Sequence, residues 1–163
     1  MVIYKKGNLL ESNCDIICHQ TNCKRSMGKG IAWQIRQKWP KVYDDYCFYI
    51  DRMYNSGAVS KSSDLLGMVS WTEIEDNKYV MNFFSQDKYY PIGRRHTDYK
   101  AFTKCCNALK KFILKHDLDK SNITIGFPYK IGCGLAGGSW DVVSAIIERE
   151  FEGYKVEIYE YEV

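Results

Sequence analysis

Apolar residues along the chain alternate between short continuous runs, typical of buried strands, and longer stretches with helical spacing. The runs predict strands at residues 2–5, 15–20, 65–72, 79–85, 122–127 and 154–161. The helical spacing predicts helices at residues 31–39, 41–55, 97–115 and 140–151. Strands that alternate with helices in this order favour an α/β fold, with helices on both faces of a mixed, largely parallel sheet. The last strand alternates apolar and charged residues, so we expect it at an edge of the sheet.

A glycine-rich segment, residues 131–139, lies between a predicted strand and a predicted helix. Glycine permits positive φ angles and lets the backbone approach a ligand closely. The N–H groups of the loop and the positive end of the helix would then face an anion, and Ser139 is suited to cap that helix. A tight turn without a ligand is the alternative, but such a turn needs fewer glycines. The four glycines are Gly132, Gly134, Gly137 and Gly138.

A second glycine-bearing loop, residues 21–30, follows the second predicted strand. Because ligands bind at the carboxyl ends of strands in such sheets, we expect both loops to flank one elongated, phosphorylated ligand. The amide of Asn22 is suited to the vicinal hydroxyls of a sugar, and Gly28 and Gly30 would let backbone N–H groups come near. Lys29 either contacts a phosphate or is solvated. The pattern matches neither the Walker sequence nor the dinucleotide-binding fingerprint.

The predicted loop at residues 85–98 has the highest density of polar chemistry. Its ionisable side chains include Lys88, Arg94, Arg95, His96 and Asp98. Such a set contains candidates for a general acid, a general base or an anion-binding cation. A solvated loop in which Asp98 caps the next helix is the alternative.

Two other side chains near the glycine loops have a structural and a functional interpretation. His19 is expected to be packed near its strand end rather than to act as a ligand. Cys133 would have a lowered pKa if it lay at a helix N-terminus, but a small cysteine packed in a tight loop is the favoured interpretation.

Composition narrows the class of protein. A chain of 163 residues fits one domain with a buried core, and a net charge of +3 does not by itself argue for nucleic-acid binding. The seven cysteines lack the spacing of a zinc or thioredoxin-like site, which predicts free thiols in a reducing cytoplasm and no metal. Neither a signal peptide nor a transmembrane stretch is indicated.

Several segments together resemble the macro domain family, whose members bind ADP-ribose. They are Gly7-Asn-Leu9, His19 to Ala32, Arg95-His-Thr-Asp-Tyr99, and Ile131-Gly-Cys-Gly-Leu135 with Trp140. The combination of Asn-Cys-x(3)-Met-Gly-Lys-Gly-Ile-Ala with Ile-Gly-Cys-Gly-Leu is specific. It is most similar to the branch of the terminal ADP-ribose protein glycohydrolases and the ADP-ribose-1''-phosphate phosphatases. The resemblance implies a three-layer α/β/α macro-domain fold with a mixed, largely parallel central sheet, formed by residues 1–163 as a single macro domain.

The resemblance also implies a ligand site. In this family the second glycine loop wraps the diphosphate, the first holds the distal ribose, and the adenine lies near the first strand. The matching positions are Asn8, Leu9, Asn22, Met27, Gly28, Lys29, Gly30, Ile31, Ile131, Gly132, Cys133, Gly134, Leu135, Ala136, Gly137 and Gly138, with Tyr159 or Tyr161 stacking on adenine. The catalytic candidates are Asn22, which would orient the ribose, and Lys88, His96 or Asp98, which would activate water.

The function that this resemblance implies is hydrolysis of ADP-ribose 1''-phosphate to ADP-ribose and phosphate, mainly by positioning a water molecule. Neither a metal nor another cofactor is expected. The alternatives are an ADP-ribosyl hydrolase that removes ADP-ribose from protein or nucleic acid, and a non-catalytic ADP-ribose-binding module. No membrane partner is expected, and nucleic acid enters only as a modified substrate.

Two positions depart from the family pattern. Many members carry Asp where this chain has Asn8, and that carboxylate holds the adenine amino group, so base selectivity is expected to be weaker. The glycohydrolases use a Lys, here near Lys88, together with an Asp at the position of Ala136. Because alanine cannot handle a proton or a ribosyl intermediate, this departure disfavours lysine–aspartate glycohydrolase chemistry.

Overall fold

The structure is a computed structural model that describes residues 1–161. Its strands are β1 (Val2–Lys6), β2 (Ile16–Thr21), β3 (Val69–Glu75), β4 (Lys78–Phe84), β5 (Thr124–Pro128) and β6 (Lys155–Glu160). Its helices are α1 (Gly30–Lys38), α2 (Pro40–Asn55), α3 (Tyr99–Lys115) and α4 (Trp140–Glu150), with short 3-10 helices η1 (Leu9–Glu11) and η2 (Ser62–Leu65). The predicted order of strands and helices is confirmed.

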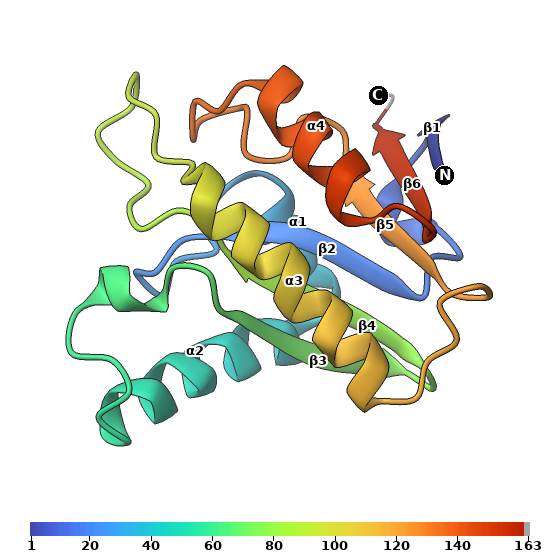
Figure 1. The fold of residues 1–163 in the computed structure, drawn as a ribbon. Helices are drawn as coiled ribbons and strands as arrows, with labels where there is room; N and C mark the ends of the chain where they lie inside the picture. Colours follow the sequence, from blue (N-terminus) through green and yellow to red (C-terminus); the bar gives the residue numbers. More distant parts are fainter. Residues whose placement is uncertain (162–163) are drawn as a thin grey trace.

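The central sheet has the strand order β1-β6-β5-β2-β4-β3, and each neighbouring pair is parallel except β3 with β4. Figure 1 shows α3 and α4 side by side in front of this sheet. Their apolar residues form one core with that face, and those of α1 and α2 form a second core with the other face. The predicted three-layer arrangement with a mixed, largely parallel sheet is therefore confirmed.

The helices begin and end where local chemistry predicts. The Asp98 carboxylate accepts a 2.9 Å hydrogen bond from the Ala101 N–H and caps α3, as expected for an N-cap aspartate. Pro40 begins α2, and Trp39 before it adopts a non-helical conformation, because proline disfavours helical geometry in the preceding residue.

No helix among residues 1–161 is long and apolar enough to cross a membrane.

The position of β6 corrects one prediction. This strand does not lie at an edge but between β1 and β5. The charged residue that suggested an edge, Glu157, is mostly buried and accepts hydrogen bonds from its neighbours. Its carboxylate lies 2.8 Å from the Lys5 ammonium and 2.7 Å from the Tyr159 hydroxyl. A charge is tolerated in an interior strand when it is paired and hydrogen-bonded in this way.

The predicted strand at residues 65–72 is also partly wrong. Leu65 ends the 3-10 helix η2, and the strand itself runs from Val69 to Glu75. Gly67 interrupts the extended run with a φ of +92°, and an added Cβ there would lie 2.9 Å from the Lys104 side chain. A left-handed glycine in a crowded position separates the two elements, which hydrophobicity alone cannot indicate.

His19, in the central strand β2, is packed as predicted and has no solvent exposure. Its Nε2 lies 2.6 Å from the Asn82 Oδ1, and the Asn82 amide donates in turn to Ser70. Nδ1 has no hydrogen-bond partner among the described residues. Burial lowers the pKa of His19 to about 4 despite the bond to Asn82, because the charged form loses its hydration.

We predict that His19 makes folding sensitive to acid. The unfolded chain binds a proton at His19 near pH 6.5, and the folded protein does so near pH 4. The free energy of unfolding therefore contains the full contribution of neutral His19 above pH 6.5. This contribution decreases by up to about 3 kcal/mol as the pH falls from 6.5 towards 4. Urea unfolding of the native protein and His19→Gln at pH 7, 5.5 and 4 measures it, since the variant loses only this titration. Parallel pH profiles of the two proteins would contradict the prediction.

Candidate ligand-binding site

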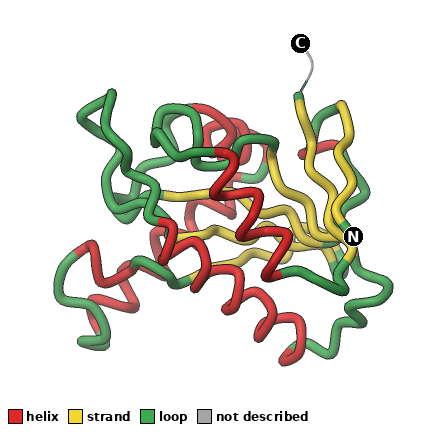
Figure 2. Tube along the Cα trace, turned by 45° about the horizontal axis from the view of Figure 1, so that its top comes forward, coloured by secondary structure: helices red, strands yellow, loops and turns green. Residues whose placement is uncertain are grey.

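A cavity of about 570 Å³ lies at the carboxyl ends of the central strands. Three separate segments form its walls: residues 20–32, 86–92 and 128–136. Figure 2 shows the loops that contain these segments projecting beyond the strand ends. Because β2 and β5 are neighbours in the sheet, the glycine loops that follow them face the same space. The expected meeting of the two glycine loops is therefore confirmed.

The first wall contains the N-terminus of α1. Gly30, Ile31 and Ala32 line the cavity, and the N-cap residue Lys29 provides no side-chain hydrogen bond. The first helical bond runs from the Trp33 N–H to the Lys29 carbonyl, so the N–H groups of the first turn pair with no acceptor in residues 1–161. These free donors and the positive end of the helix dipole favour an anion in the cavity.

The second wall is the loop that follows β5. Two of its backbone bonds close the loop on itself, from the Gly137 N–H to the Gly134 carbonyl and from the Gly138 N–H to the Gly132 carbonyl. The lining residues of this loop whose N–H groups pair with no described acceptor are Lys130, Gly132, Gly134, Leu135 and Ala136. Successive backbone donors of this kind form an anion-binding concavity. The cavity thus has backbone donors on two facing walls.

Glycine is required at two positions of this loop for different reasons. Gly132 has a φ of +74°, and a Cβ there would lie 2.9 Å from the Gln20 Oε1, so the fold itself requires glycine. Gly134 has no positive φ, and an added Cβ would meet nothing within 4 Å. The fold does not account for Gly134, whereas close approach of a ligand to its N–H does.

The Gln20 side chain at the end of β2 connects the loops beneath the cavity. Its Nε2 donates to the Gln86 Oε1 at 2.8 Å and to the Thr97 Oγ1 at 2.9 Å. Its Oε1 accepts a 2.7 Å bond from the Ser85 hydroxyl. The Thr97 hydroxyl donates in turn to the Gly132 carbonyl at 2.6 Å. One amide therefore fixes the ends of β2 and β4 relative to the loop after β5.

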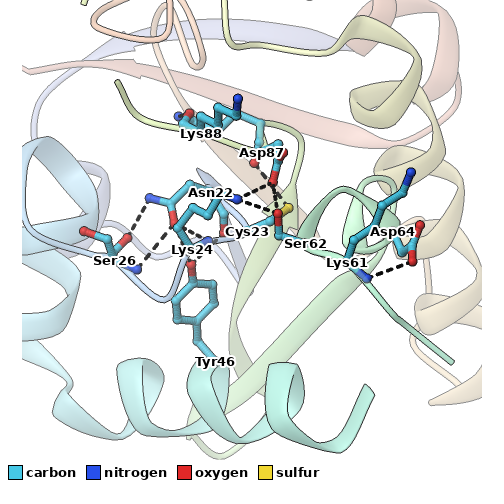
Figure 3. A network of polar contacts seen from close by, with 11 residues as sticks. Asn22, Cys23, Lys24, Ser26, Tyr46, Lys61, Ser62, Asp64, Asp87 and Lys88 are labelled. Atoms are coloured by element: carbon cyan, nitrogen blue, oxygen red, sulfur yellow. Dashed lines mark hydrogen bonds and ion pairs between the residues drawn. The ribbon is translucent and has the colours of Figure 1, made fainter. Parts of the chain in front are cut away.

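Asn22 lines the cavity and organises the loop around itself (Figure 3). Its Oδ1 accepts from the N–H groups of Lys24 and Ser26 and from the Tyr46 hydroxyl, and its Nδ2 donates to the Ser26 carbonyl at 2.9 Å. Tyr46 also donates to the Asn22 carbonyl at 2.6 Å. One amide hydrogen of Asn22 remains for a ligand. Most of the hydrogen-bonding capacity of this amide therefore maintains the shape of the loop.

A second cluster in Figure 3 joins the segments 20–32 and 86–92 outside the cavity. The Lys24 ammonium donates to the Ser62 hydroxyl at 2.6 Å, and Ser62 donates to the Asp87 carboxylate at 2.7 Å. The Cys23 N–H donates to the Asp87 carbonyl at 3.0 Å. Burial, with Asp87 nearby, raises the pKa of the Cys23 thiol to about 12. Asp87 is thus engaged in holding two loops together.

The charge of the cavity lining has one sign. Among the described residues that line it, the charged ones are Lys29 and Lys130, and none is Asp or Glu. Ala136 forms part of the wall, and its carbonyl accepts from the N–H groups of His96 and Thr97 at 2.7 and 3.2 Å. A wall of free N–H groups and ammonium ions without carboxylates suits a phosphate-bearing ligand.

A family model described as "Macro domain" matches residues 18–147 of the chain. The chain belongs to the macro domain family. It is 23% identical to an ADP-ribose 1''-phosphate phosphatase of Candida albicans, over 98% of this chain and 99% of that protein. It is 26% identical to the ADP-ribose glycohydrolase OARD1 of Bos taurus, over 98% and 90%. The fold resembles the macrodomain of Thermus aquaticus DarG with a TM-score of 0.74, at 23% identity over 100% and 99% of the two chains.

Macro domains bind ADP-ribose and its derivatives, and most of the residues expected to do so here line the cavity. These are Asn22, Met27, Gly28, Lys29, Gly30, Ile31, Ile131, Gly132, Gly134, Leu135 and Ala136. Gly137 and Gly138 lie outside the lining and close the loop. Ser139 takes the N-cap position of α4 without a side-chain cap bond. The helix end that contributes donors to the cavity is therefore that of α1 and not that of α4.

Cys133 is packed, as the favoured interpretation predicts. Its thiol donates to the Ile131 carbonyl at 3.3 Å and contacts the core beneath α3 and α4. Burial raises the pKa of this thiol, which is the opposite of the shift expected for a reactive cysteine. All seven cysteines of this macro domain are free thiols.

Three of the four catalytic candidates lie outside the cavity lining. Lys88 is exposed, and its carbonyl accepts from the Gln86 amide. The His96 ring bonds through Nε2 to the Pro91 carbonyl at 2.7 Å, so it stabilises its own loop. Asp98 is the cap of α3. Asn22 is the candidate that reaches the ligand space.

The residues expected at the adenine end also lie outside this lining. Leu9 is 3% exposed, and Asn8 uses its side-chain oxygen to accept from the Leu10 N–H at 3.0 Å. Tyr159 pairs with Pro128 in the ladder between β5 and β6, and Pro128 does line the cavity. The adenine assignment of Asn8, Leu9, Tyr159 and Tyr161 stays a prediction.

Several residues of the lining are not among the individual residues expected from the sequence to bind the ligand. These are Gln20, Thr21, Ser26, Ala32, Gln86, Tyr89, Tyr90, Ile92, Pro128, Tyr129 and Lys130. Gln20 is the last residue but one of β2, after the apolar run at residues 16–18, and a polar residue in that position is the one signal that indicates a strand end at a site. The exposed residues Tyr89, Tyr90 and Ile92 give no periodic pattern.

We predict that two neighbouring glycines respond differently to alanine. Gly132→Ala should lower the free energy of unfolding by roughly 2–3 kcal/mol, because of its positive φ and crowded Cβ. Gly134→Ala should change it by less than about 0.5 kcal/mol but weaken ADP-ribose binding by about tenfold, because the methyl group occupies ligand space. Urea unfolding and calorimetric titration measure the two effects. Full ADP-ribose affinity in Gly134→Ala would refute the contact with this loop.

Proposed function

We propose that this macro domain binds the diphosphate of an ADP-ribose derivative between its two glycine loops and hydrolyses ADP-ribose 1''-phosphate. The observation that carries the proposal is the pair of facing walls with free backbone N–H groups and no lining carboxylate. Two such walls match the two ends of a diphosphate, with the distal ribose next to Asn22. The similarity to a protein named as an ADP-ribose 1''-phosphate phosphatase supports the same reaction.

In the proposed reaction, a water oxygen attacks the phosphorus of the terminal phosphate. The P–O bond to the ribose breaks, the attacking water loses a proton, and the ribose oxygen gains one. The backbone donors hold the charged ligand, and the remaining amide hydrogen of Asn22 orients the ribose. Because no carboxylate or histidine lines the cavity among the described residues, catalysis rests mainly on positioning.

The relative named as an ADP-ribose glycohydrolase makes removal of ADP-ribose from a target the second candidate. Ala136 lines the cavity where a carboxylate would be required, and Lys88 lies outside the lining. These two placements favour the phosphatase over the lysine–aspartate glycohydrolase.

We predict that ADP-ribose stabilises the protein. At a free concentration about 100 times its Kd, the ligand should add roughly 2.7 kcal/mol to the free energy of unfolding. Thermal unfolding with increasing ADP-ribose measures this, with adenosine as the control that lacks the diphosphate. An unchanged melting temperature at saturating ADP-ribose would exclude the phosphatase, the glycohydrolase and the binding module together.

We also predict that the protein releases phosphate from ADP-ribose 1''-phosphate. The rate of release should fall about 100-fold in Asn22→Ala, because misplacement of a reacting group lowers a rate by about that factor. Tyr46→Phe is the matched control. It removes a hydroxyl that holds the same loop but keeps the amide, so its loss should be smaller. Equal losses in the two variants would show that Asn22 acts through loop shape alone.

A substrate comparison tests the choice between the two hydrolases. The purified protein should release phosphate from ADP-ribose 1''-phosphate and little ADP-ribose from an ADP-ribosylated peptide or oligonucleotide. Removal of ADP-ribose from either target, abolished in Lys88→Ala, would instead establish the glycohydrolase.

A further inference from the structure

A second hollow of about 300 Å³ adjoins the main cavity. Ile92, Gly134 and Leu135 line both spaces, so the hollow and the cavity share part of their wall. Its other lining residues include Arg94 and Arg95. The sequence indicates Arg94 and Arg95 only as two of several loop side chains that could bind an anion, and the proposed function assigns no role to this hollow.

The two arginines have no acidic partner in the part of the chain that the structure describes. Ion pairs occupy many other cations, for example Arg25 with Asp51 and Lys110 with Glu150, whereas Arg94 and Arg95 are exposed and form none. Two arginines in the wall of a hollow whose described lining has no carboxylate create a positive potential that a phosphate would neutralise.

Packing holds Arg95 in place. Its guanidinium lies 4.5 Å from the centroid of the Tyr99 ring, a favourable cation–π geometry. The Tyr99 hydroxyl accepts a 2.9 Å hydrogen bond from the Ser139 N–H, which fixes the ring against the loop after β5. Arg95 is therefore oriented before a ligand arrives.

Arg94 is attached to the same loop through its backbone. A Cβ on Gly137 would lie 2.9 Å from the Arg94 carbonyl oxygen, so the two backbones are in close contact. The next residues, His96 and Thr97, both donate backbone N–H groups to the Ala136 carbonyl. The arginines and the free N–H groups of Gly134 and Leu135 thus belong to one connected wall.

We infer that the hollow lined by Arg94 and Arg95 is a phosphate subsite, which receives a phosphate attached to the distal end of the ligand in the main cavity. This inference rests on the proposed function, because it requires a diphosphate held between the glycine loops. Guanidinium groups bind phosphate through paired, charge-assisted hydrogen bonds. The same chemistry fits the terminal phosphate of ADP-ribose 1''-phosphate and a backbone phosphate of an ADP-ribosylated nucleic acid.

The subsite distinguishes the substrate from the product. ADP-ribose lacks the phosphate that the two arginines hold, so it is bound less tightly than ADP-ribose 1''-phosphate. The product ADP-ribose, which is bound less tightly, leaves the site more readily, because the interactions with the terminal phosphate no longer hold it after the phosphate has been released.

The test compares three proteins: the native chain, the double variant Arg94→Gln/Arg95→Gln, and the control Lys111→Gln/Lys115→Gln. The control removes the same charge from the exposed surface of α3, away from the hollow. Calorimetry gives the Kd of ADP-ribose. Initial rates give the KM for ADP-ribose 1''-phosphate, or calorimetry gives its Kd if the protein binds without turnover. Equal urea midpoints confirm that all three proteins are folded.

The arginine variant should bind ADP-ribose with the native Kd, but its KM or Kd for ADP-ribose 1''-phosphate should rise about tenfold. The control should bind both ligands as the native protein does. In a second arm, an ADP-ribosylated oligonucleotide replaces the phosphate ester; weakening of this ligand alone would support the subsite and assign it to a backbone phosphate. Equal affinity of both variants for every phosphate-bearing ligand, with normal ADP-ribose binding, would overturn the subsite alone. Failure of the native protein to bind ADP-ribose would overturn the proposed function and the subsite with it.

Discussion

The Gln20 amide is the interaction on which the shape of the site depends. It lies at the end of the central strand, and its oxygen and nitrogen bond to the Ser85 hydroxyl, the Gln86 amide and the Thr97 hydroxyl. Through Thr97 it also fixes the Gly132 carbonyl. A partly buried amide is costly when its partners are absent, so these bonds hold the loops in one arrangement. The loop that offers free N–H groups is therefore tied, through the Gly132 carbonyl, to the end of β2.

The charge preference of the cavity comes mainly from backbone and not from side chains. Two walls offer N–H groups that belong to a helix start and to a glycine loop. Backbone donors are already ordered in the folded state, so binding does not pay the entropy of fixing long side chains. Lys29 and Lys130 add positive charge at the rim. This construction accounts for the abundance of glycine in a region that otherwise has few catalytic side chains.

The sequence predicts the parts of this structure that depend on local chemistry. The periodicity of α3, the cap at Asp98 and the glycine loops after β2 and β5 all follow from neighbouring residues. It fails where distant partners decide the outcome. Glu157 suggests an edge strand until Lys5 and Tyr159 are seen beside it. Likewise, His96 and Lys88 have suitable chemistry for catalysis, but neither lines the cavity, and the His96 ring bonds to the Pro91 carbonyl of its own loop.

The three walls of the cavity come from residues 20–32, 86–92 and 128–136, which are far apart in the chain. No fragment that lacks one of these segments contains the whole site, and the site forms only when β2, β4 and β5 have paired. A bound ligand is therefore linked to the whole sheet and not to one loop. Its presence should slow hydrogen exchange in strands that it never touches, because their opening requires the ligand to leave first.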